Sequence, residues 1–178
     1  MTWYCFTMTG KSKWKTCLAD HRQETLEQEK PEYMTILDVN HPCTDGEIPD
    51  NLFYRGPMYF DWDGEDDLEG VIDDVRRFMG MLEGWGFDLN QASWYLSGKK
   101  GIHCTIPMEC LFDAKVCKSG VKDLFRLYGR FAWEYATTYM DMRVYSGRRG
   151  RMWRTTCLPR QVNGQDAYKV PVTAAQLK

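Results

Sequence analysis

The sequence predicts an α+β fold with mixed or antiparallel sheets, and three observations lead to this class. Residues 58–63 alternate between apolar and polar side chains, as a strand with one buried face does. Two further alternating runs in 93–107 flank a glycine-bounded turn and predict a β-hairpin. Apolar residues recur at helical spacing over 68–85 and again over 119–139, which predicts two long helices that pack behind the strands.

The shorter elements are predicted in the same way. The aromatic-rich residues 2–8 indicate an opening strand, and 10–32 a loop with a short helix. A strand is expected over 33–39, and a surface loop over 40–52, which contains proline and glycine but few large apolar residues. Near the end of the chain, a turn at Asn163-Gly164 precedes a last strand whose Pro171 favours an edge position.

Length and composition bound the class of protein. The 178 residues suit one domain, with 1–53 as an N-terminal part and 54–178 as a core that carries the motifs. The chain has no apolar run of bilayer-spanning length and does not begin like a signal peptide, so we expect a cytoplasmic protein without a membrane partner.

The seven cysteines give no strong sign of a disulfide or a metal site. Their number is odd and no Cys-x-x-Cys occurs, so reduced cysteines are the simplest expectation. The spacing of His103, Cys104, Cys110 and Cys117 fits no standard zinc pattern, and zinc is therefore not expected.

Charge is divided unevenly along the chain. Residues 1–90 hold 8 basic and 19 acidic side chains, whereas 91–178 hold 15 basic and 6 acidic ones. A basic half suits a polyanion and an acidic patch suits a metal, although two solvated surfaces of opposite sign would give the same count.

The strand at 58–63 ends in Asp61-Trp62-Asp63. Alternation places both carboxylates on one face, where they repel each other unless a cation intervenes. Mg²⁺ is often held by one or two carboxylates together with substrate phosphates. An exposed acidic strand end before a turn is the competing interpretation of the same residues.

The predicted hairpin carries a second candidate group. Ser97 and His103 project together beside a turn that contains Lys99 and Lys100. Backbone N–H groups and lysines of this kind can bind a phosphate chain, whereas an isolated histidine is more commonly structural.

The third group lies in the C-terminal third. Residues 140–145 alternate as a strand and leave Asp141 alone on the polar face, where its partner would be either Arg143 or a shared metal. Arginines then recur in a segment that could bind phosphates or form a solvated basic loop. These arginines are Arg148, Arg149, Arg151 and Arg154.

In this order, the motifs resemble those of the archaeo-eukaryotic primase superfamily, the primase-polymerases of phages, plasmids, archaea and eukaryotes. The resemblance runs from about Tyr54 to Val172. Residues 54–63 are similar to the first motif of the family, 97–103 to its second, and Asp141 to its third. The arginine segment and Lys169 are similar to the basic part of the family's site. Trp62 is bulkier than the aliphatic residue expected there, and 163–167 is longer than the usual turn.

The resemblance implies a core of two modules, of which the catalytic one is similar to an RNA-recognition fold. The acidic first half and the basic second half of the chain would face each other across the cleft between these modules. It implies template-directed primer synthesis by two-metal nucleotidyl transfer in DNA replication, with one or two Mg²⁺ or Mn²⁺ ions. The implied metal ligands and catalytic residues are Asp61, Asp63 and Asp141. The implied nucleotide-binding residues are Ser97, Lys99, Lys100, His103, Arg148, Arg149, Arg151, Arg154 and Lys169.

The implied partners are single-stranded DNA, nucleoside triphosphates, and a replicative helicase or accessory helical domain, in the cytoplasm of a bacterial host. One alternative is a catalytically inactive nucleic-acid-binding module with the same fold. Another is a metal-dependent phosphatase or glycosyl transferase, which would need neither the hairpin motif nor Asp141. A replication nickase fits less well, because the three histidines form no paired metal motif.

Overall fold

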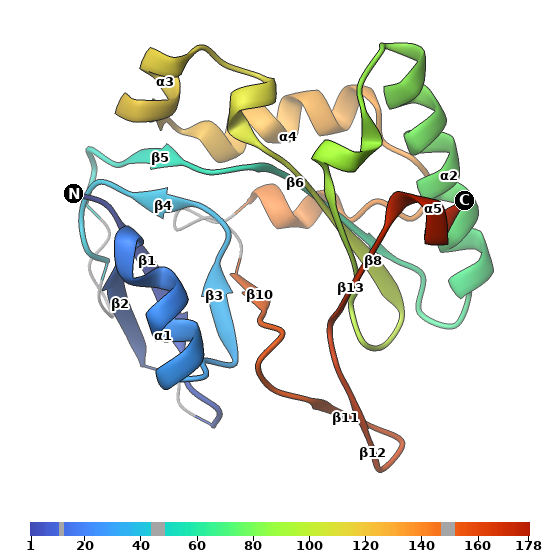
Figure 1. Cartoon of the computed structure of the whole chain (residues 1–178), viewed down its shortest axis with the longest axis horizontal. Coiled ribbons are helices and arrows are strands. Elements are labelled where there is room, and N and C mark those ends of the chain that lie inside the picture. The colour runs from blue at the N-terminus through green and yellow to red at the C-terminus, as the bar shows by residue number, and fades with distance from the viewer. Residues whose placement is uncertain (11–12, 44–48, 147–151) are drawn as a thin grey trace.

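The computed structural model describes residues 1–10, 13–43, 49–146 and 152–178. Strands and helices both contribute, and every strand pair among the described residues is antiparallel. The α+β prediction is therefore confirmed in its antiparallel form (Figure 1). No described helix is long and apolar enough to cross a bilayer.

The N-terminal residues build a seven-stranded sheet, called here the N-terminal sheet. Its main path runs β10-β3-β1-β4-β5-β9, with β2 paired to β1. The strands are β1 (Trp3–Thr7), β2 (Trp14–Leu18), β3 (Tyr33–Thr35), β4 (Asp38–Val39), β5 (Phe53–Arg55), β9 (Val121–Lys122) and β10 (Met152–Arg154). Because β9 and β10 come from late in the chain, this sheet joins both halves of the sequence.

Two segments of this sheet differ from expectation. The single strand expected over 33–39 is divided into β3 and β4, which both pair with β1. Residues 10–32 contain β2 as well as η1 (Ala19–His21) and the expected short helix, α1 (Arg22–Gln28). The β2 strand was missed because its side chains are only partly buried and its pattern is correspondingly weak.

A four-stranded sheet, called here the hairpin sheet, carries the Asp-x-Asp strand. Its order is β13-β7-β8-β6, so the proline-containing last strand lies at an edge as predicted. The strands are β6 (Met58–Asp63), β7 (Ser93–Leu96), β8 (Gly101–Ile106) and β13 (Val170–Val172). The register of β6 on β8 places Asp61 opposite His103, and that of β7 on β8 places Tyr95 opposite the same histidine.

Helix α2 (Leu68–Gly84) covers one face of this sheet. Asp67 caps it by accepting a 2.9 Å hydrogen bond from the backbone N–H of Gly70. The ring of Phe78 packs 4.6 Å from that of Phe60 and 5.2 Å from that of Trp62, measured between centroids. The apolar face of β6 therefore lies against α2, and its aspartates point to the other face.

The prediction of a second long helix is wrong. Instead of one helix over 119–139, the structure has α3 (Ala114–Ser119), then β9, then α4 (Leu124–Glu134). Gly120 has a φ of +79° and ends α3, and Val121–Lys122 pairs with β5. A long-range pairing thus overrides a helical pattern, because periodicity contains no information about tertiary partners.

The remaining elements are short. A turn at Asn163 and Gly164, both with positive φ, joins β11 (Arg160–Val162) to β12 (Gln165–Ala167), as the sequence predicts. The others are η2 (Leu89–Gln91), η3 (Met108–Cys110), η4 (Met142–Tyr145) and α5 (Ala174–Leu177).

Candidate active site

The two aspartates of β6 lie where an apolar strand meets a polar surface. Trp62 between them is fully buried, and its indole N–H donates a 3.0 Å hydrogen bond to the Thr137 hydroxyl. The Asp61 side chain is 12% exposed and that of Asp63 is 32% exposed. The bulky Trp62 thus fixes the strand from behind, and the two carboxylates share the opposite face as alternation predicts.

The backbone before Asp141 pairs with the same strand. The Asp141 N–H donates to the Asp61 carbonyl at 2.7 Å, and the Asp63 N–H donates to the Tyr139 carbonyl at 2.9 Å. These bonds flank an antiparallel bridge between Trp62 and Met140. In this register Asp141 is directly opposite Asp61, so their side chains leave the same face.

The strand predicted over 140–145 is nevertheless wrong. Met140 forms an isolated bridge and Asp141 is still extended, but Met142–Tyr145 forms η4. The Asp141 carboxylate caps this 3₁₀-helix by accepting a 2.9 Å hydrogen bond from the Arg143 N–H. A local side-chain cap of this type competes with extended structure, which explains the change.

Helix α2 holds this backbone in place. The completely buried Asp74 accepts a 2.6 Å hydrogen bond from the Tyr139 N–H and pairs with Arg77. Tyr139 also donates its hydroxyl to Asp67, and this contact raises the pKa of Tyr139 and lowers that of Asp67. Asp74 therefore positions the segment that carries Asp141, a role that its place in a helical pattern did not reveal.

Each of the three site carboxylates faces a basic side chain. The distances are 3.4 Å from Asp61 Oδ1 to His103 Nε2 and 3.1 Å from Asp63 Oδ1 to Lys100 Nζ. Arg143 contacts both oxygens of Asp141, at 2.8 and 3.1 Å. The hydrogen-bonded Asp141 raises the pKa of Arg143, and the charges of Asp63 and Asp61 raise it further. One guanidinium therefore lies within the field of all three carboxylates.

The donor set bears on the expected metal in two ways. Carboxylate oxygens are the ligands that Mg²⁺ and Mn²⁺ prefer, and the cationic groups of Lys100 and Arg143 lie against them. Within the described ranges, however, no group of three or more His, Cys, Asp or Glu side chains is arranged to hold a metal ion. The three aspartates are therefore suitable ligand types for Mg²⁺ or Mn²⁺, but Lys100 and Arg143 would have to move away from them before a metal could bind. The metal site stays a prediction.

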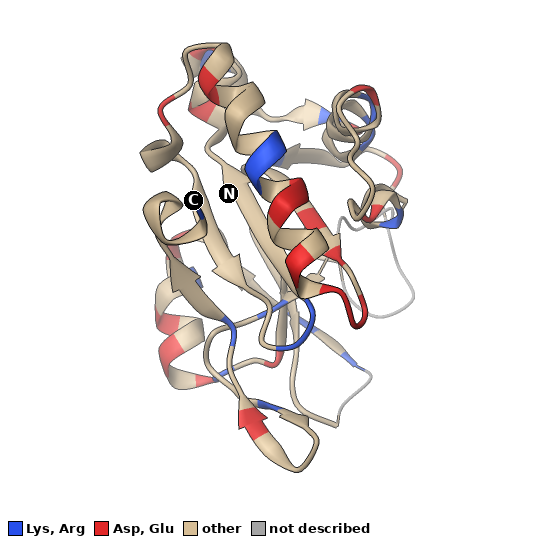
Figure 2. Ribbon diagram, turned by 90° about the vertical axis from the view of Figure 1, so that its right-hand side faces the viewer, with Lys and Arg blue, Asp and Glu red and all other residues tan. Residues whose placement is uncertain are grey.

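The hairpin turn is built around glycine and serine. The Ser97 hydroxyl accepts a 3.1 Å hydrogen bond from the Gly101 N–H, and Gly98 has a φ of +84°. A Cβ on Gly101 would lie 2.1 Å from the carbonyl oxygen of Trp62, so β8 approaches β6 here as only glycine allows. Figure 2 shows the basic turn beside the acidic segment that leads into α2, in agreement with the contact between Lys100 and Asp63.

Two adjoining cavities of about 230 Å³ each share Asp63 and Lys100. The first also contains Asp61, Ser97, His103 and Arg154, and the second contains Asp141 and Arg143. The structure thus gathers most of the predicted site residues around one carboxylate–lysine pair. Lys99 is exposed and lies outside both cavities.

The basic segment is only partly described. Arg148, Arg149 and Arg151 fall in 147–151, outside the described residues. Arg154 on β10 donates to a Glu32 carboxylate oxygen and to the Tyr33 hydroxyl, each at 2.9 Å. An ion pair between the two halves of the chain therefore engages Arg154 before any ligand arrives.

Trp153 was not predicted as a site residue, yet it organises the inner wall. Its ring stacks on the His103 ring at 4.2 Å between centroids, with 22° between the planes. The Lys169 ammonium lies 4.4 Å from the centroid of the Trp153 ring and 4.6 Å from the centroid of the Tyr95 ring. Trp153 was missed because its segment was interpreted through its arginines.

Comparison with known proteins adds no assignment, because no family model matches the chain and no curated protein matches it significantly.

Proposed function

We propose that this protein is a DNA primase or primase-polymerase of the archaeo-eukaryotic type, which synthesises primers from nucleoside triphosphates on single-stranded DNA. The observation that carries the proposal is the approach of Asp141 to the Asp61-Trp62-Asp63 strand, joined to it by the two backbone hydrogen bonds. Three carboxylates on one surface beside a lysine-bearing hairpin are what metal-dependent nucleotidyl transfer requires.

Each side chain has a defined task in this proposal. Asp61, Asp63 and Asp141 would hold Mg²⁺ or Mn²⁺, which neutralises the charge of the triphosphate when bound. Lys100 forms an ion pair with Asp63, and it would contact the phosphates instead once a metal binds to Asp63. His103 is oriented by Asp61 on one side and by the Trp153 ring on the other, so its ring donates along a fixed direction.

A specific observation favours a second candidate, a nucleic-acid-binding module without catalysis. Lys100 and Arg143 each neutralise one of the carboxylates and His103 lies 3.4 Å from the third, so each carboxylate already has a partner within the chain. In that case, the aspartates serve structure alone, and binding of single-stranded DNA depends on the basic segment.

Primer synthesis and Mn²⁺ binding together separate the two functions. The protein is incubated with single-stranded DNA, nucleoside triphosphates and Mn²⁺, and Mn²⁺ binding is measured by electron paramagnetic resonance. Asp61→Asn and Asp63→Asn should abolish both synthesis and Mn²⁺ binding while DNA binding persists. Asp73→Asn, at an exposed aspartate on α2, is the matched control and should behave as wild type.

The proposed enzyme would be refuted if the wild-type chain, supplied with a helicase or accessory helical domain, made no product and bound no Mn²⁺. Retention of DNA binding in that experiment would support the non-catalytic module instead.

A further inference from the structure

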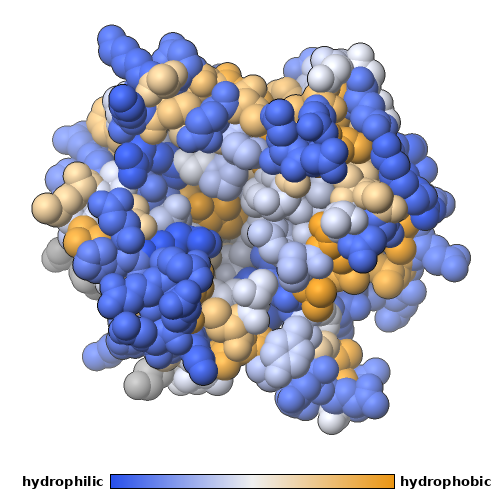
Figure 3. Space-filling model, in the orientation of Figure 1, coloured by the Kyte–Doolittle hydropathy of each residue, from blue (hydrophilic) through white to orange (hydrophobic). Residues whose placement is uncertain are grey.

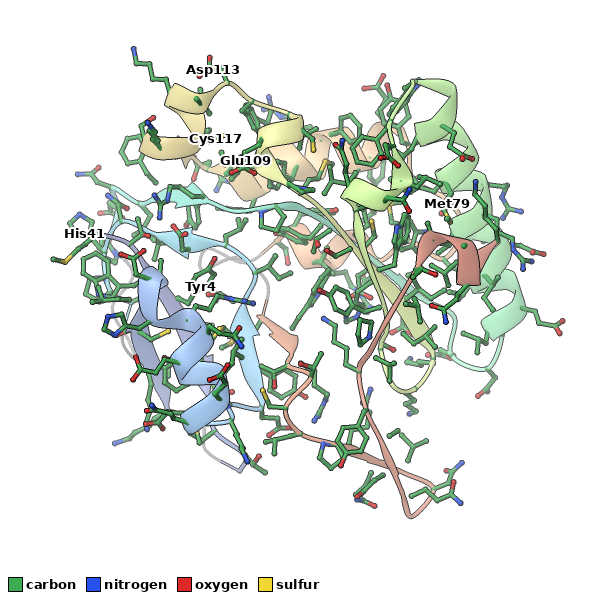
Figure 4. All side chains as sticks on the ribbon, viewed as in Figure 1. Tyr4, His41, Met79, Glu109, Asp113 and Cys117 are labelled. Carbon is green, nitrogen blue, oxygen red and sulfur yellow. The ribbon has the colours of Figure 1, made fainter. Side chains whose placement is uncertain are left out.

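A cavity of about 530 Å³ lies between the N-terminal sheet and the hairpin sheet, apart from the carboxylates. Helix α1 and strands β1, β3 and β10 line one side, and strands β7, β8 and β13 line the other. Figure 3 shows the molecular surface hollowed between these two parts. Tyr4, labelled in Figure 4, belongs to the β1 side of the lining.

The charge of this cavity has one sign. Among the described residues that line it, Arg22, Arg154 and Lys169 are basic and none is acidic. Arg154 is already paired with Glu32, but no hydrogen bond or ion pair joins Arg22 or Lys169 to any described side chain. A lining of this type favours an anion.

Lys169 is the strongest sign of a missing ligand. The residue is only 7% exposed, and its ammonium is held between the rings of Tyr95 and Trp153. Cation–π contacts replace only part of the hydration that a buried ammonium loses. Burial accordingly lowers the pKa of Lys169 to about 7, although the charge of Asp61 partly opposes this.

Arg22 adds a second cation from the other side of the cavity. Its guanidinium lies 5.1 Å from the Tyr4 ring centroid, and its charge further lowers the pKa of Lys169. The fold therefore brings two positive groups, 147 positions apart in the chain, into electrostatic contact. Two like charges facing one cavity are unfavourable together unless an anion lies between them.

We propose that Arg22 joins Lys169, which the family resemblance already implies as a nucleotide-binding residue, in a phosphate-binding site that spans the two sheets and takes a phosphate group of a nucleotide or of a DNA strand. This inference rests on the proposed function only in its choice of nucleotide phosphates. The site needs no metal, because its own cations supply the charge, and it includes none of the three site aspartates. It gives helix α1, which carries none of the predicted motifs, a direct part in binding.

Binding without metal provides the test. Isothermal titration with tripolyphosphate in EDTA and a phosphate-free, low-salt buffer should show binding to the wild-type protein. Arg22→Gln and Lys169→Met should each weaken it at least about tenfold. Arg126→Gln is the matched control, since Arg126 also lies over an aromatic ring, that of Phe125, but does not line the cavity. Its affinity should stay within about twofold of wild type.

Further arms identify the source of the phosphate and separate this inference from the proposed function. Displacement of tripolyphosphate by a short oligonucleotide assigns the site to the DNA strand, and displacement only by a nucleoside triphosphate assigns it to the substrate. Asp63→Asn should bind tripolyphosphate normally in EDTA even if no primer synthesis is ever found, because Asp63 is not among the charges that act on Lys169. Absence of binding to wild type, or equal binding to wild type, Arg22→Gln and Lys169→Met, would overturn the inference.

Discussion

Lys169 should make the stability of this protein depend on pH in a characteristic way. Burial lowers the pKa of Lys169 from 10.5 to about 7 in the folded chain, whereas the unfolded chain has the ordinary value. Below pH 7, both states are protonated and the folded state bears the full cost of a buried charge. Above pH 7, the folded state releases the proton first, so the free energy of unfolding rises with pH until about pH 10.5.

Substitution Lys169→Met removes this dependence. Each pKa unit corresponds to about 1.4 kcal/mol, so the variant should gain up to about 5 kcal/mol over wild type at pH 6. The contacts of the ammonium with Tyr95 and Trp153 are made only by the protonated form, so their loss subtracts about 1–2 kcal/mol below pH 7 and little above it. The advantage of the variant should therefore shrink steadily between pH 7 and pH 10.

The assay is urea unfolding of both proteins at pH 6, 7, 8, 9 and 10, in buffers without phosphate, which would occupy the proposed site. Lys115→Met, at an exposed lysine of α3, is the control and should follow the wild-type pH profile. A stability difference between wild type and Lys169→Met that is constant across this range would refute the assignment of Lys169 as a buried, poorly compensated cation.

Two further predictions concern the framework of the carboxylate site. Gly101→Ala should destabilise the protein by about 3 kcal/mol in urea unfolding, because its Cβ would force β8 away from β6. Gly80→Ala, in open space on α2, should instead stabilise it by about 0.5–1 kcal/mol, and equal effects of the two would contradict the close strand contact. Asp74→Ala should cost about 1–3 kcal/mol by leaving the Tyr139 N–H without its acceptor, and should reduce primer synthesis through misplacement of Asp141. Asp74→Asn, which keeps an acceptor oxygen, should recover most of the synthesis, and no recovery would argue against a positioning role.

The elements that the sequence predicts well are those whose pattern is local and whose partners are close in the chain. The alternation of 58–63, the helix at 68–84 and the hairpin at 93–106 each bury an apolar face that appears directly in the residue order. The second helix and the strand over 140–145 fail for a common reason. Long-range pairing of β9 and side-chain capping by Asp141 decide those segments, and neither produces a periodic pattern.

The same distinction explains which parts of the site could be predicted. Motif order indicated that Asp141 belongs with Asp61 and Asp63, and the backbone bonds of the structure agree in placing it beside their strand. The contribution of Arg22 could not be predicted, because α1 has no motif and its approach to Lys169 depends entirely on how the two sheets pack. The carboxylate–metal contact and the phosphate contacts stay predictions that the experiments above address.

The uneven charge of the two halves has a different meaning in the folded chain. Some of the basic residues form ion pairs between the halves: Lys100 with Asp63, Arg154 with Glu32 and Lys178 with Glu83. A basic half therefore does not by itself mean a free basic surface. Lys169 differs because its charge is buried and contacts aromatic rings rather than a carboxylate among the described residues. A lysine at such a position lowers stability near neutral pH, and a bound phosphate is the partner that would reverse this cost.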